Sequence, residues 1–270
     1  MKKLIGTLAA ALTLLAARPA KADLVSAVDP LVDNSLENRA AVFAANTGLG
    51  AALGCIGAEI SGDGCLEGLW KGSLGGAVTF AGMELGSYNA RVPFMGLAGR
   101  QVVNLGSSMT SNAMFSRGLL QRYETDFGPV VFSFDSEEGF RPYIMPLSTG
   151  VTVYHLISGH TLDLVQSIED GTFVFRLDWE SRSEILGGGG ATISNIPIHV
   201  TDYNIGRSHE NIHTYQLSRM RWADELVPEL GPIRYGAEAL NGSMSLGACI
   251  YHGDLYDYSP LELEAYSMQR

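Results

Sequence analysis

The segment from about residue 34 to residue 120 is rich in small residues and poor in β-branched ones. Within it, Gly68, Gly72 and Gly76 are spaced four residues apart. Residues four apart lie on one face of an α-helix, and glycines at that spacing let two helices approach closely, in lipid or in a soluble core. The segment therefore predicts closely packed helices that serve as a scaffold.

The same segment raises the question of a membrane. A helix that spans a bilayer needs about 20 consecutive apolar residues. The run 40–58 carries no charge, but Glu59, Glu67 and Lys71 follow it. We therefore expect a soluble helical hairpin, with membrane association through these helices as the less favoured alternative. A third helix is expected from 96 to 115.

Residues 1–22 have the features of a secretory signal. Lys2 and Lys3 form a basic start, an apolar stretch follows, and an A-x-A cleavage site ends at Ala22. The sequence therefore predicts cleavage after Ala22 and a periplasmic or secreted mature protein of residues 23–270.

Composition narrows the function classes. The chain carries 18 basic and 29 acidic residues, a formal net charge of −11. Removing the signal takes away four basic residues and no acidic one, which leaves 14 basic residues and a charge of −15. So acidic a chain is unsuited to binding nucleic acid. In an oxidising compartment, Cys55 and Cys65 can pair, with glycines supplying flexibility between them.

The pattern changes from residue 128 onward. Residues 129–134 read as a strand and 135–139 as a turn, and further strands are expected at 141–147, 150–157, 161–167 and 172–178. These segments predict an antiparallel β-meander with short hairpins. The stretch 191–200 alternates apolar and polar residues, and Pro197 indicates an edge strand.

The run His209-Glu210-Asn211-Ile212-His213 follows this strand and matches H-E-x-x-H. On a helix, residues four apart lie one turn of about 5.4 Å from each other. Two imidazoles so placed can hold one Zn²⁺, with Glu210 as general base on the metal-bound water. The other interpretation is a solvent-facing helix with two incidental histidines.

A catalytic zinc usually keeps three protein ligands and an open position for water. Near the end of the chain, Ser259 can cap a helix with Pro260 at its first position. This places Glu262 and Glu264 in the opening turns, and either of them can reach a metal from there.

The run Glu262-Leu263-Glu264-Ala265 matches the Glu-x-x-Ala part of a known pattern. Together with the H-E-x-x-H run it resembles the glutamate zincins, zinc metallopeptidases whose second helix supplies a Glu ligand. The resemblance is limited to His209–Gln216 and Ser259–Tyr266, and Tyr266 stands where an Asp is usual. It implies His209, His213 and Glu262 as zinc ligands and Glu210 as the catalytic residue.

The expected fold is α+β. It begins with a helical scaffold at about 30–125, continues with a β-meander at 128–200, and ends with the metal-site helices at 204–270 in a single domain. The expected function is a zinc-dependent, metallopeptidase-like hydrolase of the bacterial envelope that acts on a peptide or protein. The rival is a non-enzymatic envelope scaffold or membrane-associated protein in which the H-E-x-x-H helix is vestigial or structural.

Overall fold

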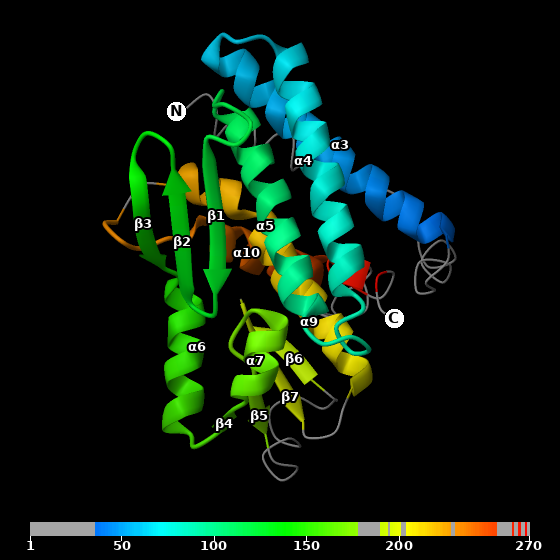
Figure 1. Cartoon of the computed structure of the whole chain (residues 1–270), viewed down its shortest axis with the longest axis vertical. Coiled ribbons are helices and arrows are strands. Elements are labelled where there is room, and N and C mark those ends of the chain that lie inside the picture. The colour runs from blue at the N-terminus through cyan, green and yellow to red at the C-terminus, as the bar shows by residue number, and fades with distance from the viewer. Residues whose placement is uncertain are drawn as a thin grey trace.

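The computed structural model describes residues 36–177, 190–193, 195–200, 204–227 and 230–252, together with Leu261, Glu264, Ala265 and Met268. The expected signal segment 1–22 and the expected ligand Glu262 lie outside these residues. Within the described ranges the chain has the expected α+β architecture: helices first, then strands, then further helices (Figure 1).

The N-terminal scaffold is a hairpin of α3 (Leu36–Ser61) and α4 (Cys65–Gly86), against which α5 (Met95–Met114) packs (Figure 1). A Cβ atom placed on Gly54 would lie 2.0 Å from the carbonyl oxygen of Gly68. Real Cβ atoms do not come so close to another backbone, so these crossings require glycine. The predicted hairpin and third helix are confirmed.

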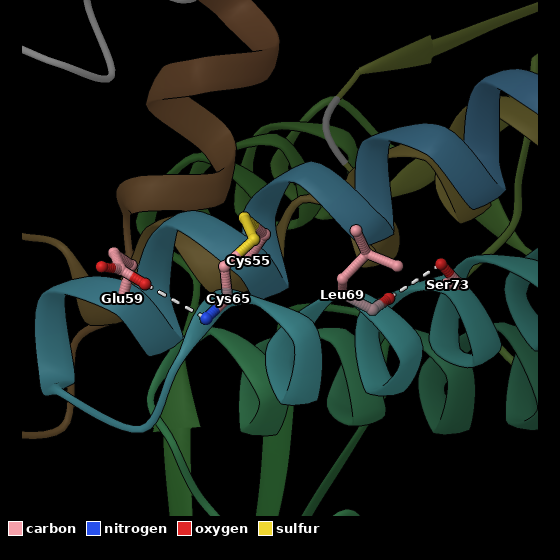
Figure 2. Close-up of a disulfide and its surroundings, with 5 residues drawn as sticks. All are labelled: Cys55, Glu59, Cys65, Leu69 and Ser73. Atoms are coloured by element: carbon pink, nitrogen blue, oxygen red, sulfur yellow. Dashed lines mark hydrogen bonds between the residues drawn. A yellow bond between two sulfur atoms is a disulfide. The ribbon is translucent and has the colours of Figure 1, made fainter.

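A disulfide between Cys55 and Cys65 ties the two helices together near their connecting turn (Figure 2). The Glu59 carboxylate accepts the backbone N–H of Cys65 at 3.2 Å. In the turn, Gly62 and Gly64 have φ of +89° and +86°, which side-chain-bearing residues rarely adopt. The pairing of Cys55 with Cys65, which the sequence indicated as possible, is thus present as a disulfide.

Among the described helices, α3 alone is long and apolar enough to cross a membrane, by length and composition only. Of its most apolar window, 33% is buried inside the protein. Its inward face carries a buried polar residue, Asn46, whose amide donates to Glu264 and accepts from Arg219. Polar contacts therefore join α3 to residues more than 170 positions further along the chain.

In the described part of the chain, two sheets follow the scaffold. The first is an antiparallel meander of β1 (Arg122–Phe127), β2 (Val130–Asp135) and β3 (Gly139–Ile144). The second has the order β4 (Thr161–Leu162), β5 (Phe175–Leu177), β7 (Ile196–Val200) and β6 (Gly190–Ile193), with β5 and β7 parallel. The predicted meander is thus confirmed for the first sheet, which also contains a strand, β1, before the first expected one.

The strand predicted at 150–157 is wrong, because this segment belongs to the helix α6 (Pro146–Ile157). Pro146 stands at the first turn, where a missing N–H costs nothing. The Glu238 carboxylate accepts the N–H groups of Leu147 and Ser148 at 2.9 and 2.8 Å, and so caps the helix. A cap supplied from 90 residues away leaves no local signal.

The strand predicted at 161–167 is also largely wrong, since only β4 is extended and α7 (Leu164–Asp170) follows it. The Asp163 side chain accepts the N–H of Gln166 at 3.0 Å, and Gly171 ends the helix with φ of +70°. Both are ordinary helix-end signals that the sequence does contain.

The stretch 191–200 is a hairpin of β6 and β7 and not a single edge strand. Among the described strands of this sheet β6 is the outermost, whereas Pro197 lies in the inner strand β7, opposite Thr192. Asn195, which follows β6 and precedes β7, is fully buried and donates its amide to Asp126 and to the Gly128 carbonyl. This buried polar anchor explains why the chain reverses here.

Candidate metal centre

The H-E-x-x-H residues lie in α9 (Asn204–Arg219), which contacts α4, α5, β6 and β7 (Figure 1). His209 is 6% exposed and Glu210 is 4% exposed. Ile212 is fully buried in a core that includes Met83 and Val103. The alternative interpretation of this segment, a solvent-facing helix with two incidental histidines, is therefore wrong.

The two histidines face each other across one helical turn. Nε2 of His209 lies 3.1 Å from Nε2 of His213, with the rings nearly perpendicular at 84°. Zinc–nitrogen bonds of about 2.0–2.1 Å at a tetrahedral angle would place two ligand nitrogens about 3.3 Å apart. A metal ion fits this pair of nitrogens, as does one shared proton.

Gln216 fixes which nitrogen of His213 faces His209. The Gln216 amide NH₂ donates to the Leu261 carbonyl at 2.7 Å and to Glu264 at 3.0 Å. Its oxygen is therefore turned toward Nδ1 of His213, 2.9 Å away, which must be the protonated nitrogen. The lone pair of His213 is then on Nε2, as a metal ligand requires.

Glu210 lies beside the edge strand β6. The Thr192 hydroxyl is 2.8 Å from Oε2 of Glu210 and 2.9 Å from its carbonyl oxygen. One strand hydroxyl thus lies within hydrogen-bond distance of both the carboxylate and the backbone carbonyl of Glu210, and it donates its single hydrogen to these two acceptors. Thr192 could not be recognised from the sequence, because only the packing of the strand against the helix brings it to Glu210.

Glu264, the alternative third ligand, is engaged elsewhere. Both of its oxygens accept from Arg219, at 2.6 and 2.8 Å, and Asn46 donates to one of them at 3.1 Å. Among the described residues, no group of three or more His, Cys, Asp or Glu side chains can hold a metal ion. The described part of the candidate site is therefore the histidine pair, with Glu210 on the same helix α9.

The opposite face of α9 meets a buried ionic network. Arg100, fully buried, donates to Asp126 at 2.9 Å and also binds Thr214 of α9. Burial alone would raise the pKa of Asp126, but the charges of Arg221 and Arg100 hold that pKa below its usual value. The network fixes the position of α9 and, with it, the direction of the histidine pair.

Comparisons of the chain with family models, with curated proteins and with solved structures gave no match. What the site can do is therefore inferred from its own residues.

Proposed function

We propose that the chain is a zinc-dependent, metallopeptidase-like hydrolase of the bacterial envelope with a peptide or protein substrate. The observation that supports this most is the 3.1 Å separation of the two Nε2 atoms of His209 and His213. Glu210, the general base of the H-E-x-x-H pattern, is buried on the same helix.

The proposed ligands are His209, His213 and Glu262. Glu262 is proposed from the Glu-x-x-Ala match of residues 262–265. Gln216, whose oxygen faces His213, donates to Leu261 and Glu264 of the same segment. When bound, zinc would supply a Lewis acid that lowers the pKa of a water molecule toward about 7.

The chain's own residues then handle the proton. A bond forms between the water oxygen and the peptide carbonyl carbon, and the C–N bond breaks. Glu210 takes the proton from the water and passes it to the leaving amine. The Thr192 hydroxyl, 2.8 Å from Oε2, holds the carboxylate in one orientation during this transfer.

An envelope location is supported by two separate features. A structural disulfide, here between Cys55 and Cys65, is typical of proteins in oxidising compartments. The basic start, apolar stretch and A-x-A site of residues 1–22 are typical of export signals.

The variant Glu210→Gln tests the proposal, because the amide keeps the size of the side chain and removes the base. We expect unchanged zinc content and at least about a 100-fold loss of casein hydrolysis. Glu67→Gln, at a surface glutamate paired with Lys71, is the matched control and should keep full activity. Undiminished hydrolysis by Glu210→Gln would refute the proposed role.

The rival function, a membrane-associated scaffold, rests on the length and composition of α3. It predicts that the protein floats with phosphatidylcholine vesicles in a density gradient and that Glu210→Gln changes none of its behaviour. The hydrolase predicts that Glu210→Gln loses hydrolysis, whether or not the protein floats with vesicles.

A further inference from the structure

The helices α6 and α7, joined by residues 158–163 at the lower end of Figure 1, expose a group of large apolar side chains. Ile157, the last residue of α6, is 81% exposed. The group consists of Val153, Leu156 and Ile157 of α6 and Leu164, Val165 and Ile168 of α7. We call it the α6–α7 apolar surface. Single exposed apolar residues are ordinary, but such a concentration marks a site of interaction.

This part of the chain is also almost free of charge. Residues 142–162 include no Asp, Glu, Lys or Arg. Burial, followed by the neighbouring His160, lowers the pKa of His155 to about 4, so this imidazole is neutral near pH 7. The first charged residue that follows, Asp163, is ion-paired with Arg176. A partner on this surface therefore meets apolar groups and finds almost no charge to pair with.

An apolar cavity of about 330 Å³ lies beside the same helix, between α6 and the second sheet. Leu147 and Tyr154 of α6 line it and are 48% and 53% exposed, so the cavity is reached from the side of α6 that faces solvent. Its described lining carries no Asp, Glu, Lys or Arg. Such a cavity accepts an apolar chain and rejects a charged group, which would lose its hydration without gaining a partner.

The composition of this surface favours a lipid bilayer over a protein partner. Protein interfaces concentrate their binding energy in Trp, Tyr and Arg, whereas Leu and Val are under-represented there. The α6–α7 apolar surface consists of Leu, Ile and Val, which have no hydrogen-bonding groups to select a partner. With 12 residues, α6 is too short to span a bilayer, which needs about 20, so it can only lie along the bilayer surface.

We propose that the α6–α7 apolar surface docks on a zwitterionic lipid bilayer and that an acyl chain of one lipid enters the cavity. Helices that lie at a bilayer surface bury their apolar side by about 5–10 Å. Tyrosine is common at that depth, and Tyr154 stands at the rim of the cavity. Anionic lipids would repel a chain of net charge −11. The inference does not rest on the proposed function.

Ile157→Glu tests the surface, because a glutamate at so exposed a position disturbs no packing. Leu66→Glu in the first turn of α4, at a residue 78% exposed, is the matched control. The proteins consist of residues 23–270, and binding is measured by flotation with phosphatidylcholine vesicles. We expect Ile157→Glu to bind at least about tenfold more weakly than the wild type, and Leu66→Glu to bind equally well. Undiminished binding of Ile157→Glu, as docking through α3 would give, or no binding of the wild type, would overturn the inference.

Lipid composition and depth provide a second test. Vesicles in which phosphatidylglycerol replaces half of the phosphatidylcholine should bind more weakly at low salt, because like charges repel. Tyr154→Trp adds an indole at the cavity rim, and phosphatidylcholine brominated in its acyl chains should quench the emission that this variant has beyond the wild type. Tighter binding to the anionic vesicles, or bound protein without quenching, would overturn the inference.

A second copy of the chain is the other occupant that the test distinguishes. Analytical ultracentrifugation without vesicles should show the same state of association for the wild type and Ile157→Glu. A wild-type dimer that Ile157→Glu dissociates would show that a second copy covers the surface, and would overturn the docking on lipid.

Discussion

The α3–α4 hairpin and the surroundings of α9 are packed by opposite means. Between α3 and α4, backbone meets backbone, and a Cβ on Gly50 would lie 2.1 Å from the Gly72 carbonyl oxygen. Around α9, long polar side chains fill the interior, with Arg100 fully buried against Asp126 and Asn195. Where the two helix backbones cross, there is no room for an added atom. In the polar network, loss of the Asp126 charge would leave buried arginines without their counter-charge.

The two regions contribute in different ways to the position of the candidate metal centre. In the hairpin, the spacing of the glycines allows the two helices to pack with their backbones in contact. The polar network specifies the rotation and height of α9, because each hydrogen bond has a direction. Substitutions that act on one region and spare the other therefore test the comparison.

The largest effect is expected from Gly54→Ala, because its Cβ would lie 2.0 Å from the Gly68 carbonyl oxygen and the helices must separate. We expect the free energy of unfolding to fall by at least about 4 kcal/mol in chemical denaturation. Gly48→Ala, with no atom within 4 Å, should instead gain about 0.5–1 kcal/mol. Equal effects at the two positions would show that close approach does not explain the glycines.

Asp126→Asn tests the polar region. It leaves Arg100 and Arg221 buried without their counter-charge, and we expect a loss of about 3–5 kcal/mol in the same assay. Glu138→Gln, in an ion pair with Arg141 at half-exposed positions, should cost less than about 1 kcal/mol. A loss below 1 kcal/mol in Asp126→Asn would mean that the network does not stabilise the fold.

Asp224 and Glu225 are neighbours whose pKa values shift in opposite directions. Burial raises the pKa of Asp224 to about 6, although the N–H of Ala237 opposes the shift. Burial would also raise the pKa of Glu225, but a hydrogen bond and the charge of Arg117 bring it below its usual value. The pair shows that partners, more than burial, decide the charge state in this region.

The pH dependence follows from the sign of the Asp224 shift. Between pH 4 and 6 the folded state binds the Asp224 proton more strongly than the unfolded state does, so stability falls as pH rises. Asp224→Asn removes this fall. The stability of the variant minus that of the wild type should therefore increase by about 2–3 kcal/mol from pH 4 to pH 7. A constant difference across denaturation curves at pH 4, 5, 6 and 7 would contradict the shift.

A smaller effect is expected from Gln216→Leu, which removes the acceptor that holds Nδ1 of His213. Zinc affinity, measured by competition with a chelating dye, should fall by about 10–100-fold. Gln121→Leu, at a glutamine that binds the Gly118 N–H, is the control and should leave affinity unchanged. Unaltered affinity in Gln216→Leu would mean that the hydrogen bond does not position the ligand.

The predictions from the sequence were most accurate for features that depend on the local spacing of residues along a helix. The pairing of His209 with His213 needs only a helix, and the close contact of Gly54 with Gly68 needs only two helices joined by a short turn. The ends of α7 were also readable from Asp163 and Gly171, but the apolar residues between them favoured a strand.

What the sequence could not predict depends on residues far apart in the chain. Glu238 caps α6 from 90 residues away, and Thr192 reaches Glu210 only because β6 packs on α9. The same holds for Arg100, which in isolation is indistinguishable from a surface arginine. Such contacts follow from the assembled fold and have no short-range pattern.

The most direct test of the account is the zinc content of purified residues 23–270, measured by mass spectrometry for the wild type, His213→Ala, Glu262→Ala and the control His160→Gln. We predict one zinc per chain in the wild type and in the control, none in His213→Ala, and weakened binding in Glu262→Ala. A folded wild type that takes up no zinc when zinc is supplied, or zinc retained in His213→Ala, would contradict the metal centre.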